Sequence, residues 1–100
     1  MHSFICNASI QMLPIQTAGK HAYQWVDDVV EMIQQSGLAY TVTAFNTVVE
    51  GSFEQIHQLV NTINTQLVAN HCTEWILQVQ YQLRSDEPVT ASEKLAKYTS

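Results

Sequence analysis

The chain has 100 residues, of which 46% are hydrophobic and 13% are charged, with four Lys and Arg against nine Asp and Glu. This length predicts one domain over residues 1–100 with one modest core, and the apolar fraction excludes a disordered chain. Neutralising phosphates needs clustered basic side chains, and residues 21–83 contain no Lys or Arg. We therefore expect no nucleic acid, anionic membrane or polyphosphate as a partner.

The first predicted element is a strand over residues 4–13, where apolar and polar side chains alternate. Its apolar face is formed by Phe4, Cys6, Ala8, Ile10 and Met12, and its polar face by Asn7, Ser9 and Gln11. We expect Pro14 and the segment to Gly19 to end this strand.

Residues 20–36 have the period of an amphipathic helix. Its apolar stripe is formed by Ala22, Val26, Val29, Val30 and Ile33. Trp25 flanks this stripe and is either an edge of the core or a contact for a ligand or a second subunit. Gly37 is placed to adopt the left-handed conformation that ends a helix.

Residues 39–51 are rich in Thr, Tyr and Val, which predicts two short strands with a turn near residues 45–46. Ser52 and Gln55 have the spacing of a capping box. A second helix should therefore begin at Ser52 and run to about Ala69.

Residues 74–84 alternate again, which predicts another strand. Its apolar face is formed by Trp75, Leu77, Val79, Tyr81 and Leu83. A loop over residues 86–88 follows, and Thr90 or Ser92 is expected to cap a last short helix through Tyr98.

The order of the main elements is strand, helix, strand, strand, helix, strand, which is typical of ferredoxin-like domains of the α+β class. Right-handed crossovers give an antiparallel sheet in the order 4-1-3-2 with two helices on one face, and the short C-terminal helix follows this unit. We call the sheet face opposite the two helices the open face, because a monomer leaves it uncovered.

The alternation places uncharged amides and hydroxyls on the open face. They are Asn7, Ser9 and Gln11 on the first strand, Thr41 and Thr43 on the second, and Gln78, Gln80 and Gln82 on the fourth. Solvated faces usually include Lys and Glu, and this set has neither. The open face is therefore either ordinary solvated surface or, as we favour, a contact for another subunit or for a neutral or cationic ligand.

Glu50 stands out because it is an acid within the otherwise apolar, strand-like run of residues 47–51. It is either solvated at the strand end, where it favours the following helix N-terminus, or a carboxylate that binds a cationic or amidine-like group. The sequence leaves open which face of the sheet Glu50 takes.

The sequence contains no catalytic or metal-binding pattern. The Ser residues lack a Gly-x-Ser-x-Gly context, the four His residues lack metal-ligand spacing, and three Gly residues can hardly form a phosphate loop. We expect no enzyme activity, no metal and no cofactor. Cys6 and Cys72 should be buried, reduced thiols, and the lack of an export signal or of a span of about 20 apolar residues favours the cytoplasm.

Three segments of the chain resemble the small thiamine-binding protein family. They are the strand motif ending at Pro14 (residues 8–14), the helix and its end with Ser-Gly-Leu-Ala-Tyr (residues 26–40), and the Thr-x-x-Glu-Gly signature (residues 45–51). A closing Glu-Lys-Leu at residues 93–95 also resembles the family, so the resemblance covers nearly the whole chain.

The resemblance implies a ferredoxin-like domain that assembles into dimers or tetramers through its sheets. It also implies binding of thiamine or its hydroxymethylpyrimidine part as ligand, without catalysis. Thr47, Glu50 and Gly51 match the signature, and Ser9 and Gln11 lie on the matching first strand. With the polar and aromatic side chains that suit the chemistry of thiamine, the candidate ligand-binding residues are Ser9, Gln11, Trp25, Tyr40, Phe45, Asn46, Thr47 and Glu50.

The chemistry of thiamine, with its cationic thiazolium and its aminopyrimidine, suggests roles for these residues. Glu50 would pair with a pyrimidine nitrogen or offset the thiazolium charge. The ligand's amino group or hydroxyl would bond to Ser9, Gln11 and Asn46. One of three aromatic residues would stack on a ring: Phe45, Tyr40 or Trp25. We therefore expect a homo-oligomer that stores, buffers or senses thiamine. The lack of basic residues predicts that it prefers free thiamine to the diphosphate.

Two other functions remain possible from the sequence. The first is a structural or regulatory module whose sheet binds a protein without any small ligand. The second, less favoured for want of a catalytic constellation, is an enzyme acting on a thiamine precursor.

Overall fold

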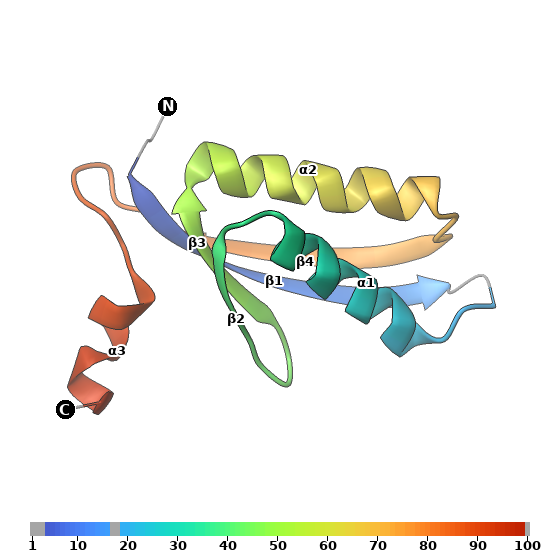
Figure 1. The fold of residues 1–100 in the computed structure, drawn as a ribbon, viewed down its shortest axis with the longest axis horizontal. Coiled ribbons are helices and arrows are strands. Elements are labelled where there is room, and N and C mark those ends of the chain that lie inside the picture. The colour runs from blue at the N-terminus through green and yellow to red at the C-terminus, as the bar shows by residue number, and fades with distance from the viewer. Residues whose placement is uncertain (1–3, 17–18, 100) are drawn as a thin grey trace.

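The structure, a computed structural model, describes residues 4–16 and 19–99 (Figure 1). Its elements in chain order are β1 (Ile5–Gln16), α1 (Ala22–Gln35), β2 (Ala39–Val42), β3 (Thr47–Ser52), α2 (Phe53–Ala69), β4 (Glu74–Gln82) and α3 (Ala91–Thr99). Each predicted element is present. Within the described part of the chain, no helix is long and apolar enough to span a lipid bilayer.

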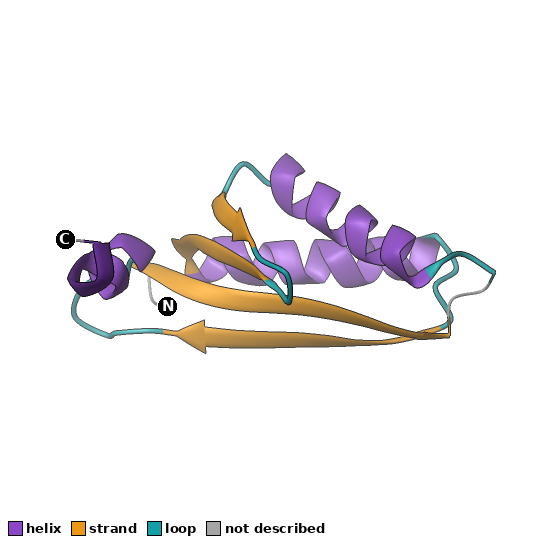
Figure 2. Ribbon diagram, turned by 90° about the horizontal axis from the view of Figure 1, so that it is seen from below, coloured by secondary structure: helices purple, strands orange, loops and turns teal. Residues whose placement is uncertain are grey.

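The four strands form one antiparallel sheet in the order β2-β3-β1-β4, which confirms the predicted order 4-1-3-2. Helices α1 and α2 cover one face of this sheet, and α3 lies beyond the end at which β1 begins (Figure 2). The chain is therefore an α+β domain with the predicted ferredoxin-like arrangement, and the other face of its sheet is open.

Strand β1 is longer than the sequence predicts, because it continues through Pro14 to Gln16. Pro14 lies opposite Trp75 of β4, and the register shifts between Pro14 and Gln16. Beyond Ile10, β1 pairs with β4 alone. A proline is tolerated where one side of a strand is unpaired, because proline has no N–H and can occupy a position where none is needed for pairing. Residues 17 and 18 of the predicted break lie outside the described residues.

The core lies between the sheet and helices α1 and α2. Every second residue of β1 faces it, as predicted: Cys6, Ala8, Ile10 and Met12. The helices bury Trp25, Val29 and Ile33 from α1 and Ile56, Leu59, Ile63 and Leu67 from α2. Trp25 is 2% exposed, so it belongs to the centre of the helix's buried face. The Nζ of Lys20 lies 4.3 Å from the centre of the Trp25 ring.

Side chains fix the start of each helix. In the predicted capping box of α2, Ser52 Oγ accepts from the N–H of Gln55 at 3.1 Å, and Gln55 Oε1 accepts from the N–H of Ser52 at 2.9 Å. His21 and Gln24 form a similar box at α1, which the sequence did not indicate. Thr90 Oγ1 accepts from a backbone N–H at 3.2 Å and so begins α3.

Candidate functional site

The strand register places the predicted polar residues together on the open face. Asn7, Ser9 and Gln11 of β1 lie opposite Gln82, Gln80 and Gln78 of β4. Because residues of one face recur every second position along a strand, Val48 and Glu50 of β3 share this face. Thr41 joins it opposite Val48. Thr43 follows the end of β2 at Val42 and lies in the β2–β3 turn.

Glu50 lies on the open face, which resolves the question that the sequence left. It is opposite Asn7 in the register, and Asn7 Nδ2 donates to Glu50 Oε1 at 3.1 Å. The other signature residues, Thr47 and Gly51, alternate with Glu50 and are buried on the helix side. One carboxylate therefore stands among neutral amides and hydroxyls.

The β2–β3 turn is tied to the open face by a short chain of hydrogen bonds. Asn46 Nδ2 donates to Ser9 Oγ at 2.7 Å, and Thr43 Oγ1 donates to Asn46 Oδ1 at 2.7 Å. The N–H of Thr43 donates to the carbonyl of Asn46 at 2.8 Å. Asn46 thus joins Ser9 in one cluster, although 37 residues separate them.

Two hollows lie side by side on this face and share Ser9 and Gln80. The Gln11 hollow, with a volume of about 410 Å³, also includes Gln78. The Asn7 hollow, with a volume of about 400 Å³, extends to Gln82 and Lys94. Each volume lies in the range of small-molecule sites, which is about 300–1,000 Å³.

The remaining predicted site residues lie elsewhere. Thr47 is buried opposite Ile10 on the helix side, and Trp25 is inside the core. Tyr40 is on the helix side of β2, opposite Val49. Phe45 is 81% exposed at the end of the hairpin. A small cavity of about 80 Å³ under this hairpin brings together four predicted residues: Gln11, Phe45, Asn46 and Thr47.

Sequence reasoning placed Asn7 on the open face but did not select it as a site residue, and it did not select Gln80 or Lys94. The alternation of β1 and β4 already put Asn7 and Gln80 beside Ser9. Lys94 comes from α3, and its Nζ donates to Gln82 Oε1 at 2.8 Å. The sequence offers no signal for that contact, because it depends on the path of the chain after β4.

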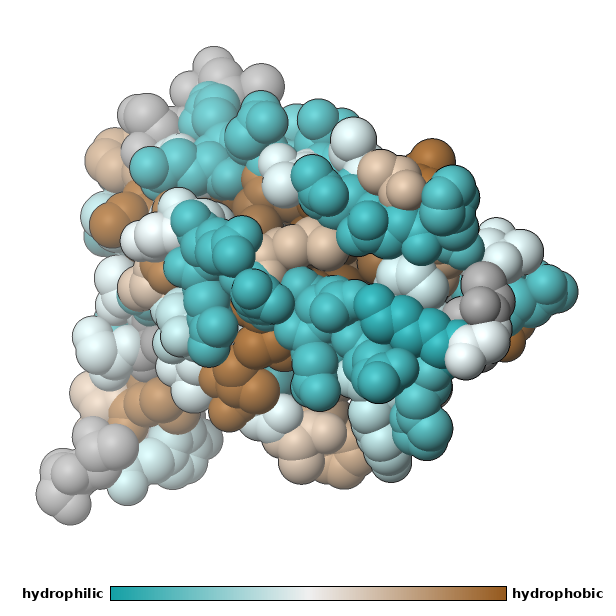
Figure 3. Space-filling model, turned by 45° about the vertical axis from the view of Figure 1, so that its right-hand side comes forward, coloured by the Kyte–Doolittle hydropathy of each residue, from teal (hydrophilic) through white to brown (hydrophobic). Residues whose placement is uncertain are grey.

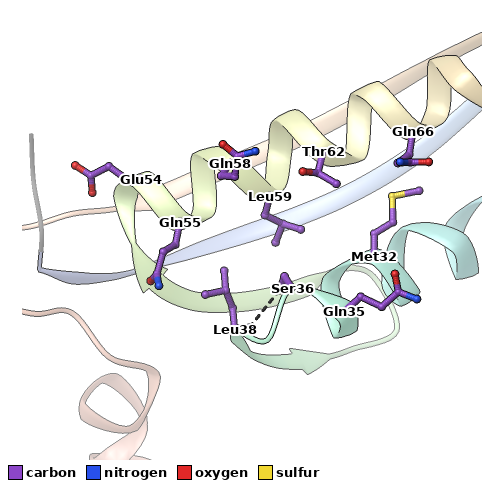
Figure 4. Close-up of a pocket in the computed structure, with 10 residues that line it drawn as sticks. All are labelled: Met32, Gln35, Ser36, Leu38, Glu54, Gln55, Gln58, Leu59, Thr62 and Gln66. Carbon is purple, nitrogen blue, oxygen red and sulfur yellow. Dashed lines mark hydrogen bonds between the residues drawn. The ribbon is translucent and has the colours of Figure 1, made fainter.

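A larger groove of about 630 Å³ lies on the opposite side of the molecule, between α1 and α2 (Figure 4). Met32, Leu38 and Leu59 form its apolar part, and Glu54 and Gln58 of α2 line it. Figure 3 shows this helical side, where hydrophilic side chains border more hydrophobic surface. None of the eight predicted site residues lines this groove.

The described residues offer little titratable chemistry. No group of three or more His, Cys, Asp and Glu among them is placed to hold a metal ion. Cys6 and Cys72 are buried, unbridged thiols, as predicted. Desolvation by burial raises the pKa of both thiols above the ordinary value of 9.0, so each is protonated at neutral pH.

The strand order, the register and the two helices on one face define a ferredoxin-like α+β domain. Solved structures match this arrangement, two of them at 28% and 31% sequence identity. A family model described as thiamine-binding protein matches residues 8–99. The chain therefore belongs to the thiamine-binding protein family, which confirms the resemblance that the sequence motifs indicated.

Individual relatives cover nearly the full chain. A Clostridium perfringens protein named as a member of UPF0045 is 28% identical over 93 residues, which are 93% of this chain and 96% of the relative. A Bacillus cereus structure of a domain of unknown function, DUF77, has a TM-score of 0.89 at 31% identity, covering 98% of this chain and 93% of its own. A Thermotoga maritima structure, described as a candidate thiamine biosynthesis/salvage protein, has a TM-score of 0.81 at 28% identity. The match covers 94% of this chain and 98% of the Thermotoga chain.

Proposed function

We propose that this protein binds thiamine, or its hydroxymethylpyrimidine part, on the open face and does not transform it. Family membership over residues 8–99 supports the choice of ligand. The observation that carries the choice of site is the position of Glu50 among the amides and hydroxyls of this face. A carboxylate attracts the cationic thiazolium or accepts a hydrogen bond from an N–H group of the pyrimidine, and neutral amides bond polar groups without adding charge.

The non-catalytic part of the proposal rests on the kind of groups that line the two hollows. Amides, the hydroxyl-bearing Ser9 and Tyr81, Lys94 and a few apolar residues line them, and none of the hydrogen bonds among the described residues joins a nucleophile to a base there. Storage, buffering or sensing of thiamine is the role that we propose for such a binding protein, and its two unbridged cysteines fit the cytoplasm as its compartment.

Self-association would complete such a site. Small-molecule sites usually bury 70–90% or more of the ligand, whereas these hollows lie on the sheet face that α1 and α2 do not cover. At the far end of the same face, Leu13 lies opposite Ile76, and these side chains are 36% and 46% exposed. A second copy placed over this face would cover the apolar end and close the hollows.

Replacing Glu50 by Gln tests the site directly. We expect Glu50→Gln to weaken thiamine binding by about 10- to 100-fold, because a hydrogen bond to a charged group contributes roughly 1.5–3 kcal/mol. The amide still accepts from Asn7, so the fold should persist. Isothermal titration calorimetry of both proteins with thiamine gives the comparison.

Glu54→Gln is the matched control, because it makes the same chemical change in the groove on the helical side. It should bind thiamine as the unchanged protein does. Equal losses in the two variants would point to net charge as the cause, and a loss in Glu54→Gln alone would move the site to the groove between α1 and α2.

A further inference from the structure

Asn7 is unusual among the polar residues of the open face, because it is only 3% exposed and one of its side-chain atoms has no partner. Its Nδ2 donates to Glu50 Oε1 at 3.1 Å and to the carbonyl of Val89 at 3.3 Å. Its Oδ1 is buried and accepts no hydrogen bond. The residue lines the Asn7 hollow.

The orientation of this amide follows from its neighbours. Glu50 Oε1 and the Val89 carbonyl are both acceptors, so the amide nitrogen must face them and the oxygen must face away. Val89 is itself fixed, since it is fully buried and its N–H donates to the carbonyl of Ile5 at 2.7 Å. The segment after β4 therefore holds Asn7 in place.

A buried acceptor without a donor is unfavourable, and such groups are rare in folded proteins. The missing partner is an N–H or O–H donor. A neighbouring carboxylate, Glu50, is also an acceptor, so it favours a ligand that is cationic or offers a further N–H donor. The amino group of an aminopyrimidine has this chemistry, because it carries two N–H donors, and thiamine adds a cationic ring.

We propose that Asn7 is the residue that selects the amino group of the ligand, with Oδ1 accepting one of its N–H bonds while Nδ2 holds Glu50 in position. This inference rests on the proposed function. Solvent does not reach Oδ1 in the unliganded arrangement. Gln82 and Lys94 line the same hollow with exposed side chains, joined by the hydrogen bond from Lys94 Nζ to Gln82 Oε1 at 2.8 Å. The proposal requires side chains of this hollow to change rotamer as the amino group enters, a motion that is fast for exposed residues.

Oxythiamine tests the proposal, because it carries an oxo group in place of the amino group of thiamine. An acceptor then faces the acceptor Oδ1, so the unchanged protein should bind thiamine about 10- to 100-fold more tightly than oxythiamine. Replacing Asn7 by Leu, which has a similar shape and no acceptor, should bring this ratio close to one. Calorimetric titration with both compounds provides the two affinities.

Gln58→Leu is the matched control, since it exchanges an amide for the same side chain in the groove between α1 and α2. It should keep the ratio of the unchanged protein. A thermal melt will show whether Asn7→Leu folds. If it does not, the ratio of the affinities of the unchanged protein for thiamine and oxythiamine still tests the proposal, because equal affinities would overturn it.

The outcomes separate this inference from the proposed function. Absence of thiamine binding to the unchanged protein would refute the proposed function and this inference with it. Thiamine binding with a ratio near one, or with a ratio that survives Asn7→Leu, would refute the role of Asn7 and leave the proposed function intact.

Discussion

At the residue scale, the three signature residues lie on different faces of the sheet and have different roles. Thr47 and Gly51 face the helices, whereas Glu50 faces outward and bonds to Asn7. At Gly51, an added Cβ would lie 3.1 Å from Leu38 Cδ2 and 3.1 Å from Gln55 Oε1. The glycine therefore permits close packing of β3 against Leu38 and the capping residue of α2, and it makes no contact with the proposed ligand site.

Gly51→Ala should therefore lower stability and leave binding unchanged. We expect the free energy of unfolding to fall by about 1 kcal/mol, because overpacking a dense region typically costs roughly 1–3 kcal/mol. Urea unfolding measures this change, and the affinity for thiamine should stay within about twofold of the unchanged protein's. In a Leu38→Ala background the penalty should shrink, because one of the two close contacts is gone. A tenfold loss of affinity at unchanged stability would instead place Gly51 in the site.

At the scale of elements, the faces of β1 and β4 could be predicted from sequence because their side chains alternate cleanly. The face of β3 could not, since Val48, Val49 and Glu50 follow one another without alternation. The β2–β3 hairpin sets the face of β3, because Thr43 bonds to Asn46 and Val42 then pairs with Thr47. Turn geometry of this kind sets register, and residues 43–46 have no strong turn signature such as Asn-Gly.

The β2–β3 hairpin should lose stability when its side-chain tether is removed. Asn46→Ala removes the bonds to Ser9 and Thr43, each of which contributes about 0.5–1.5 kcal/mol. We expect the free energy of unfolding to fall by about 1–2 kcal/mol, as urea unfolding will show. Asn61→Ala on the exposed side of α2 is the control and should change it by less than about 0.5 kcal/mol. Equal effects of the two substitutions would contradict the role given to the tether.

At the scale of the whole molecule, the sequence predicted the layers and the order of the sheet. The helices α1 and α2 and the strands β1 and β4 have clear periods, β2 and β3 have the composition of strands, and the crossovers have a fixed hand. The sequence could not predict the burial of Asn7. That burial depends on contact with Val89, which is 82 residues away along the chain. It also could not show that Trp25 occupies the core and that Tyr40 takes the helix side of an edge strand.

The exposed apolar end of the open face leads to a prediction about assembly. We expect the protein to be a dimer or a tetramer at micromolar concentration, because a second copy would cover Leu13 and Ile76 and enclose the hollows. Light scattering coupled to size-exclusion chromatography measures the mass. Ile76→Lys should shift the protein toward the monomer by placing a charge on this face, whereas Val68→Lys, at an exposed position of α2, should not. A monomer in the unchanged protein would contradict the prediction.

The measurement that tests the central claim most directly is calorimetric titration of the purified protein with thiamine, with thiamine diphosphate as the contrast. We predict saturable binding of thiamine and weaker binding of the diphosphate, because the face presents Glu50 and the chain carries a net charge of −5. No heat with either compound, together with an unshifted melting curve, would contradict the claim that this protein binds thiamine.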